Sequence, residues 1–318
     1  MRNPARLLLQ LRRGTSEVLG FKFFSPAKIN LFLNVLRKRS DGTHAIETLF
    51  ERLDFGDTIY LHPISSGIEL TVRGPEKIPA DSTNLAWKAA KLLQRTCGIR
   101  QGVRILIRKQ IPVSAGLGGG SSNAATVLLG LNRLWNLGLS RKKLIALGLK
   151  LGSDVPFFIL ETSLAFGRGR GEILKKWPKP KRKIWHVLVK PPFGISTSKA
   201  YKDFDKVGVV APPVSEQVVG LTPKKTDVKM LLRSIQRGDS ETLPKLLINS
   251  LELALNKRVK IISKIKKKLV SEGACGTLLS GSGSCVFGLF LSKQKASKTA
   301  GRLKVAHKNW KVFVAATY

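Results

Sequence analysis

Apolar and polar residues alternate along the first clearly patterned segment of the chain. From Ala27 to Val35 every odd position is apolar, whereas Lys28 and Asn30 occupy the other face. A period of two residues predicts a half-buried β-strand, on which Lys28 and Asn30 point in the same direction. Turn formers at 40–42 end this pattern. Short β-prone runs predict two further strands, at 58–62 and 68–72.

A helical pattern follows these strands. Apolar residues recur at helical spacing from Asn84 to Thr96, with Ser82 or Thr83 as the expected N-cap and Gly98 as the expected end. Alternating apolar residues and arginines then predict a strand at 103–108. This strand leads into IPVSAGLGGGSSNAATVLLGLNRLW, so the predicted order is strand, glycine-rich loop and helix.

The remaining sequence predicts more helices and strands and contains no internal repeat. Ser140 is the expected cap of a short helix, after which Asp154 lies in a turn before an apolar run at 155–160. The chain is therefore expected to form two mixed α and β domains, at 21–168 and 169–318, after a basic extension at 1–20. The later predicted elements are a strand at 184–189, helices near 227–236 and 259–270, a strand, loop and strand across 277–290, and a final helix and strand.

Composition predicts a soluble protein of a reducing compartment. The chain has 318 residues, 43% of them hydrophobic, and no stretch approaches the roughly 18 apolar residues that a membrane-spanning helix needs. Its three cysteines are odd in number and far from any Cys-x-x-Cys spacing, which favours a cytoplasmic location. The extension 1–20 carries four arginines and one acid, so organellar targeting stays an alternative.

The formal net charge is +36, and only four of the 56 basic residues lie in the extension. Such a charge attracts nucleic acid, anionic membranes and phosphorylated metabolites alike, so it indicates the sign of a partner but not its class. Two basic clusters, at 175–183 and 264–268, are expected on a proline-stiffened hairpin or linker and on the exposed face of a helix. The first cluster contains a single aromatic residue, Trp177, and the second contains none, which favours a solvated face over a nucleic-acid site.

The glycine-rich loop is the strongest chemical signal in the sequence. Glycines let the backbone approach an anion closely, and a following helix adds its positive end, so the loop is expected to hold phosphate. It matches neither the Walker A pattern nor G-x-G-x-x-G, and an ordinary flexible loop is the alternative. The loop consists of Pro112, Val113, Ser114, Ala115, Gly116, Leu117, Gly118, Gly119, Gly120, Ser121 and Ser122.

Several segments together resemble one family. SPAKINLFLNVLRKRSDGTHAIETLFERLDFGD, the glycine-rich segment, LGSDVPFFI and LLSGSGSCVFGLF are similar to the 4-diphosphocytidyl-2-C-methyl-D-erythritol kinases of the GHMP kinase superfamily, in that family's order and spacing. The resemblance implies an α/β (α+β) fold with a ribosomal-S5-like N-terminal domain and a ferredoxin-like C-terminal domain. Its nearest rivals are kinases of the superfamily with another acceptor, such as phosphomevalonate or homoserine.

The resemblance implies transfer of phosphate from ATP, with Mg²⁺, to the 2-hydroxyl of a cytidine diphosphate derivative of methylerythritol. Asp154 matches the base of this family, and Lys28 matches the lysine expected beside it. Taken alone, Lys28 fits a surface lysine of a strand and Asp154 fits a cap of the turn before Pro156. Within the matched motifs, the catalytic interpretation is favoured.

The resemblance also implies binding residues for both substrates. His44 matches a histidine that holds the cytidine, and without the match it would be an exposed turn residue; Thr43 replaces the aromatic that the family usually has before it. Asn84 and Lys109 match adenosine contacts, with a capping amide and a strand-end cation as alternatives. The remaining substrate residues are expected to be Asn30, Tyr201, Gly281 and Gly283, of which the glycines also fit a plain hairpin turn. No membrane partner is expected, nucleic-acid binding is the rival from another class, and the protein is expected to be a monomer or a homodimer.

Overall fold

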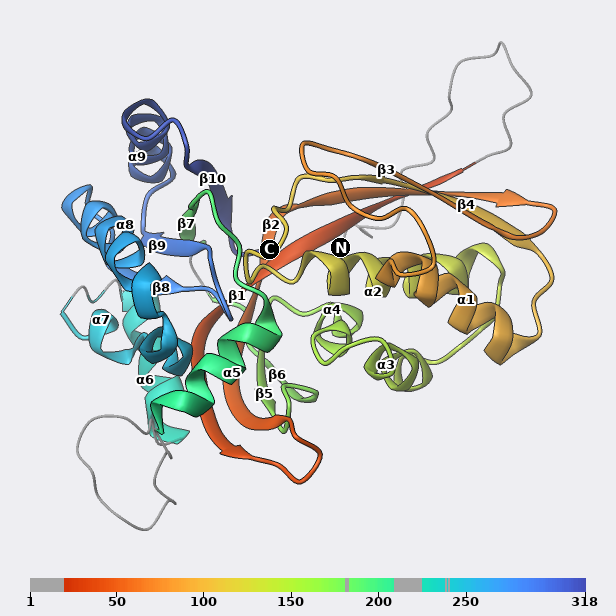
Figure 1. Ribbon diagram of the computed structural model, residues 1–318, viewed down its shortest axis with the longest axis horizontal. Coiled ribbons are helices and arrows are strands. Elements are labelled where there is room, and N and C mark those ends of the chain that lie inside the picture. Colours follow the sequence, from red (N-terminus) through yellow and green to blue (C-terminus); the bar gives the residue numbers. More distant parts are fainter. Residues whose placement is uncertain (1–19, 181–182, 209–224, 238, 240) are drawn as a thin grey trace. The chain divides into compact units, whose positions relative to one another are not determined.

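The computed structural model describes residues 20–180, 183–208, 225–237, 239 and 241–318. The predicted extension at 1–20 lies outside the described residues except for Gly20. The chain forms two compact units, each built from separate segments (Figure 1). Among the described residues, the first unit comprises 20–27, Gly56–Pro112 and Gly118–Glu161, and the second comprises Lys28–Phe55, Val113–Leu117 and the described part of Thr162–Tyr318.

Strands and helices alternate along the described chain. The strands are β1 (Phe21–Lys38), β2 (His44–Ile64), β3 (Ile68–Arg73), β4 (Gly102–Arg108), β5 (Leu164–Arg168), β6 (Ile173–Trp177), β7 (Trp185–Lys190), β8 (Gly276–Leu279), β9 (Val286–Phe290) and β10 (Lys311–Ala316). The α-helices are α1 (Leu85–Cys97), α2 (Gly119–Leu134), α3 (Arg141–Leu149), α4 (Val155–Leu160), α5 (Thr197–Val207), α6 (Lys225–Arg237), α7 (Leu243–Leu246), α8 (Val259–Ser271) and α9 (Lys293–Ala306), with two 3₁₀ helices, η1 (Ser250–Ala254) and η2 (Asn256–Arg258).

The first unit places helices on one side of a sheet. The second half of β2 pairs antiparallel with β4, and β4 pairs parallel with β3 through the crossover helix α1. The helices α1 to α4 lie together on one side of these strands (Figure 1). Gly98 ends α1 in the left-handed conformation, as predicted. The predicted N-cap was wrong, because Asn84 caps α1 and neither Ser82 nor Thr83 does.

The strand β1 is longer and more buried than its pattern predicted. Its odd positions from Ala27 to Val35 are buried, but Lys28 and Asn30 on the other face are only 4% and 2% exposed. The prediction of a half-buried strand was therefore wrong, because polar side chains on the second face are buried too. Lys28 and Asn30 do point in the same direction, since Lys28 Nζ donates to Asn30 Oδ1 at 2.7 Å.

The second unit contains a four-stranded antiparallel sheet with the strand order β10-β7-β9-β8. In chain order this is 4-1-3-2, and helices connect β7 to β8 and β9 to β10, which is the ferredoxin-like arrangement expected from the resemblance. The predicted strand, loop and strand across 277–290 correspond to β8, the turn at 280–285 and β9. β5 and β6 form an antiparallel hairpin, so Lys175 and Lys176 of the basic cluster lie on its second strand. Residues 181 and 182 of that cluster lie outside the described residues.

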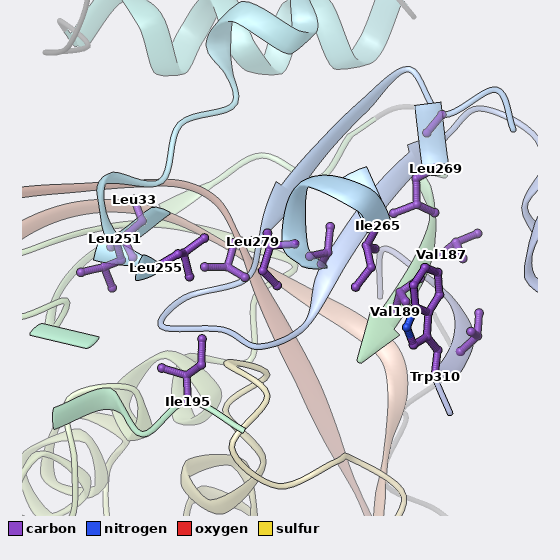
Figure 2. Close-up of a cluster of buried hydrophobic side chains, with 14 of the residues drawn as sticks. Leu33, Val187, Val189, Ile195, Leu251, Leu255, Ile265, Leu269, Leu279 and Trp310 are labelled. Carbon is purple, nitrogen blue, oxygen red and sulfur yellow. The ribbon is translucent and has the colours of Figure 1, made fainter. Parts of the chain in front are cut away.

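A hydrophobic core holds the second unit together. The helices α8 and α9 pack against the four-stranded sheet, and their buried apolar side chains share one core with those of β7 and β9. Figure 2 shows the part of this core around Ile265, Leu269, Val187 and Val189. Ile265 and Leu269 of α8 are fully buried beside Val187 and Val189 of β7. The basic cluster at 264–268 therefore alternates between core and surface, because Ile265 faces inward while its lysine neighbours carry the solvent-facing side.

Two further features bear on the compositional predictions. No described helix combines the length and apolar character that crossing a bilayer requires. Cys97, Cys275 and Cys285 are all free thiols. Burial raises the pKa of Cys285 to about 12, so this thiol stays protonated at neutral pH.

Truncation of a core residue of α8 should destabilise the second unit much more than truncation of a surface residue of the same type. Ile265 is 0% exposed and Ile261 is 40% exposed on the same helix. Ile265→Ala should lower the free energy of unfolding by about 2–5 kcal/mol, and Ile261→Ala by less than about 1 kcal/mol. Urea denaturation of both variants measures this, and equal shifts of the midpoint would contradict the assigned core.

The thiols should react unequally in the native protein. A thiol reagent such as DTNB at pH 8 should leave Cys285 unmodified, because it is buried and its pKa is about 12. Full reaction of all three thiols is expected only after unfolding in guanidinium. Rapid native modification of Cys285, mapped by mass spectrometry, would show that this part of the core opens.

Candidate active site

The glycine-rich turn follows β4 and runs directly into α2. Residues 113–117 belong to the second unit, and the chain returns to the first unit at Gly118. The helix begins at Gly119, so Gly119 to Ser122, predicted as loop, form its first turn. Ser114, Gly116 and Gly118 have φ values of 49°, 74° and 69°, so the predicted loop is an ordered turn of left-handed residues.

The amino end of α2 is open to an anion. Gly118 is the N-cap residue and has no side chain to cap the helix, and the first turn carries no acidic residue. The first backbone bond of the helix runs from the Ser122 N–H to the Gly118 carbonyl at 2.9 Å. The amide groups of Gly119 to Ser121 precede it and have no acceptor within the helix. They therefore combine hydrogen-bond donors with the positive end of a 16-residue helix.

A buried polar network lies at both ends of this turn in the first unit. The fully buried carboxylate of Asp57 accepts from Lys109 Nζ at 2.5 Å and from the backbone N–H groups of Gln110 and Ile111 at 2.7 and 2.9 Å. It also accepts from Asn123 Nδ2 at 2.9 Å. Four donors thus satisfy a carboxylate that has no access to water.

The middle of the turn packs against the loop between β8 and β9 within the second unit. The carbonyl of Ala115 accepts from the Cys285 N–H at 3.1 Å, and that of Gly116 accepts from Ser280 Oγ at 3.0 Å. A Cβ at Gly116 would overlap the carbonyl oxygen of Ser280. Glycine is required there by this close approach as well as by the positive φ.

Lys28 lies beside these two loops. Its backbone N–H donates to the Leu117 carbonyl at 3.0 Å, and its ammonium donates to Asn30 Oδ1 at 2.7 Å. Asn30 donates in turn to Thr48 Oγ1 at 2.7 Å, which orients its amide so that the oxygen faces the lysine. A Cβ at Gly281 would lie only 3.1 Å from Lys28 Nζ. Lys28, Asn30, the turn at 113–117 and Gly281 are therefore brought together in the second unit.

The two glycines predicted to bind substrate differ in their surroundings. Gly281 has a φ of 53° and faces Lys28 and Asn30. Gly283 has a φ of 85°, and a Cβ there would meet the side chains of Leu279 and Ile195 instead. Gly281 thus lies among polar site residues, whereas Gly283 packs against apolar ones.

Asp154 lies in the first unit at the N-cap position of α4. Its carboxylate makes no capping bond to that helix, so the alternative interpretation as a simple cap is not supported. The side chain is partly exposed. A Cβ at Gly152 would lie 3.8 Å from Ser121 Oγ, so the turn that carries Asp154 is next to the first turn of α2.

His44 and Tyr201 come together in the second unit. Their rings stack with centroids 4.9 Å apart and an interplanar angle of 22°. His44 is 9% exposed, so the alternative of an exposed turn residue was wrong. Asp205 accepts from His44 Nε2 at 2.6 Å and from Lys38 Nζ at 2.7 Å. The Lys38 hydrogen bond, with a smaller contribution from His44, lowers the pKa of Asp205 below its ordinary value, which keeps the carboxylate ionised at neutral pH.

Asn84 and Lys109, predicted to contact adenosine, are both engaged within the protein. Asn84 Oδ1 accepts from the Ala86 N–H at 3.0 Å, and its amide donates to the Pro79 carbonyl at 2.8 Å. Lys109 is 8% exposed and its ammonium is paired with Asp57. Each has the structural role that was the alternative to a nucleotide contact, and a role in binding remains a prediction.

Sequence reasoning did not identify Asp57, Asp205 or Thr48 as residues of these networks. Asp57 lies in the matched segment that ends in DFGD, but a single acid after a glycine carries no signal of four buried donors. Asp205 is separated from His44 by 161 positions, and only the fold brings them together. Thr48 lies on β2, and its position opposite Asn30 depends on strand pairing that the sequence pattern did not define.

Comparison with known proteins places the chain in a family. The model of the GHMP kinases N terminal domain matches residues 84–162, and that of the GHMP kinases C terminal matches residues 231–308. The 4-diphosphocytidyl-2-C-methyl-D-erythritol kinase of Pelotomaculum thermopropionicum is 41% identical over 87% of this chain and 92% of its own length. The enzyme of the same name from Geobacillus kaustophilus is 42% identical over 83% of this chain and 86% of its own length.

Comparison with solved structures supports the same family. A crystal structure of 4-(cytidine 5'-diphospho)-2C-methyl-D-erythritol kinase superposes with a TM-score of 0.77 and 33% identity over 93% of this chain and 98% of the other. A homoserine kinase from Cytophaga hutchinsonii superposes with a TM-score of 0.71 over 97% of each chain, but at 19% identity it shows the fold alone. The two-domain fold class is confirmed, and the chain belongs to the family of 4-diphosphocytidyl-2-C-methyl-D-erythritol kinases within the GHMP kinases.

Proposed function

We propose that this protein transfers the γ-phosphoryl group of ATP to the 2-hydroxyl of 4-diphosphocytidyl-2-C-methyl-D-erythritol, a step of the non-mevalonate route to isoprenoid precursors. The observation that carries this proposal is about 40% identity to kinases of this name over most of both chains. The uncapped amino end of α2 after a glycine-rich turn supports it independently, because this is a phosphate-binding arrangement.

ATP phosphates would bind at the turn from Pro112 to Ser122. The amide groups of Gly119 to Ser121 are the donors, and the small residues before them let phosphate oxygens approach the backbone. Asn84 and Lys109 would line the adenosine side of this site. Asn84 would do so from the start of α1, where its side chain is already held by the cap.

Asp154 would act as the base. Phosphoryl transfer forms a bond between the acceptor oxygen and the γ-phosphorus and breaks the bond from that phosphorus to the β–γ bridging oxygen, so ADP leaves. The proton of the acceptor hydroxyl passes to the Asp154 carboxylate. Lys28, oriented by Asn30, would stabilise negative charge on the transferring group, and Gly281 leaves space beside its ammonium.

Mg²⁺ fits this site without a dedicated protein cluster, because it is commonly held by one or two carboxylates together with substrate phosphates. In the described part of the chain, no group of three or more His, Cys, Asp or Glu side chains could hold a metal ion. The Ser121 hydroxyl in the first turn of α2 is a partly exposed oxygen donor. It would hold the ion together with the ATP phosphates, and the ion would neutralise charge on the phosphoryl oxygens, while the Asp154 carboxylate acts as the proton acceptor and not as a metal ligand.

The cytidine of the acceptor would bind at His44 and Tyr201. Because ionised Asp205 accepts from Nε2 of His44, the proton lies on that nitrogen, and the ring orientation is fixed before substrate arrives. Thr43 is tied to Asp41 by its backbone N–H at 3.0 Å and its hydroxyl at 2.5 Å. Stacking on the base would therefore come from Tyr201, with Thr43 ordering the turn.

Removal of the proposed base should nearly abolish turnover. Asp154→Asn should lower kcat by about 10³-fold, because general-base catalysis contributes roughly 10²–10⁴-fold. ADP release with ATP, Mg²⁺ and 4-diphosphocytidyl-2-C-methyl-D-erythritol measures this. Glu161→Gln at the other end of α4 is the matched control and should retain activity, since Glu161 forms a surface ion pair with Arg141 and is not one of the proposed site residues. Absence of turnover in the wild type would overturn the proposed function.

Loss of the His44 side chain should raise the KM for the acceptor and leave the KM for ATP nearly unchanged. His44→Ala removes one hydrogen-bonding and stacking partner, so the KM for the acceptor should rise about tenfold, while the KM for ATP stays within about twofold. Asp205→Asn should cause a smaller rise, because it weakens the orientation of His44 without removing the ring. Initial rates at varied acceptor and fixed saturating ATP test both variants. Equal increases in the two KM values would argue against cytidine binding at His44.

A further inference from the structure

We propose that Asp57 is a positioning residue that fixes both ends of the glycine-rich turn and thereby sets its affinity for ATP. The inference deepens the proposed function and rests on it, because it assigns the turn to ATP phosphates. Asp57 touches neither substrate in this assignment. It acts through the backbone that binds the phosphates.

The contacts of Asp57 divide between the two ends of the turn. Oδ1 accepts from the backbone N–H groups of Gln110 and Ile111, at 2.7 and 2.9 Å, directly before Pro112. Oδ2 accepts from Asn123 Nδ2 at 2.9 Å, in the first turns of α2. A single fully buried carboxylate therefore spans the entry and the exit of the turn within the first unit.

A pair of serine hydroxyls further fixes the end of the glycine-rich turn, where α2 begins. Asn123 Nδ2 also donates to Ser25 Oγ at 2.9 Å, and Ser25 Oγ lies 2.8 Å from Ser122 Oγ. Ser25, Ser122 and Asn123 are all less than 5% exposed. The start of α2 is thus tied to β1 and, through Asn123, to Asp57 on β2.

Charge makes the carboxylate more than a structural hydrogen-bond acceptor. Lys109 is only 8% exposed, and a Cβ at Gly119 would lie 2.9 Å from its ammonium nitrogen. The cation therefore lies beside the positive end of α2, where it would be repelled if it stood alone. Asp57 pairs with it at 2.5 Å, which offsets this repulsion.

The isosteric substitution Asp57→Asn separates the hydrogen bonds at the start of the turn from the ion pair with Lys109 and the bond to Asn123. The side-chain amide that Asp57→Asn introduces could still accept from the N–H groups of Gln110 and Ile111, but its amino group would face the donors of Lys109 and Asn123. The entry of the turn would keep its hydrogen bonds, while the exit and the charge compensation would be lost. Asn123→Ala is the milder variant, because it detaches the exit from Asp57 and leaves the ion pair intact.

Calorimetric titration of each full-length protein with ATP, in the absence of acceptor, tests the inference. Asp57→Asn should raise the Kd for ATP at least about tenfold, and Asn123→Ala about threefold, because bonds to a charged group are lost or detached. The KM for the acceptor at saturating ATP should stay within about twofold of the wild-type value. Glu69→Gln is the control and should change neither quantity, since Glu69 pairs with Arg104 at the surface with both side chains 55% exposed.

The titration distinguishes a positioning role from a merely structural one. A structural role would lower the fraction of protein that binds while the remaining sites keep the wild-type Kd, and this result would overturn the inference. An unchanged Kd in Asn123→Ala would also overturn it, even if Asp57→Asn failed to fold. If the wild-type protein phosphorylates the acceptor but the variants bind ATP with the wild-type Kd, the inference about Asp57 is overturned and the proposed function stands. Wild-type protein that does not bind ATP would instead remove the proposed function on which it rests.

Discussion

The buried ion pair between Asp57 and Lys109 is the constraint on which the phosphate-binding turn depends. A carboxylate with no exposure would be costly unless its lone pairs were satisfied, and here four donors satisfy them. Three of these donors come from residues 109–111 and the fourth from α2, so the electrostatic requirement of one side chain defines where the turn begins and ends. The glycines then allow the backbone to connect these two fixed ends through left-handed conformations.

Lys28 shows a different solution for a buried cation. Its ammonium donates to the amide oxygen of Asn30, which Thr48 holds in place, and Gly281 leaves space beside it. Lys109 is paired with the buried carboxylate of Asp57, whereas the Lys28 ammonium lies beside Asn30 and the loop that carries Gly281. The two buried lysines therefore lie in different surroundings, and the one beside Gly281 is the candidate for contact with a transferring phosphate.

Much of the fold could be predicted from hydrophobic periodicity because the relevant interactions are local. Gly98 ends α1 and Ser140 caps α3 as expected, since both signals act within one turn of helix. The polar face of β1 could not be predicted as buried, because its burial depends on partners such as Thr48 and Phe50 from β2. The start of α2 at Gly119 was missed for a similar reason, since glycine has poor intrinsic helix propensity and the network of Asp57 and Asn123 overrides it.

The candidate site was predictable only as far as its motifs extend along the chain. The glycine-rich turn, Lys28 and Asp154 lie in contiguous matched segments, whereas Asp57 and Asp205 act on residues 52 and 161 positions away. Both are acids that hold a basic side chain of the site, and in a chain with a net charge of +36 such acids are scarce. With only 20 acidic residues against 56 basic ones, few acids are available to pair with basic side chains of the site; Asp57 does so fully buried, and Asp205 does so from an exposed position. Because acids are scarce in this chain, the few that pair with site residues are easier to single out than any one of its many lysines.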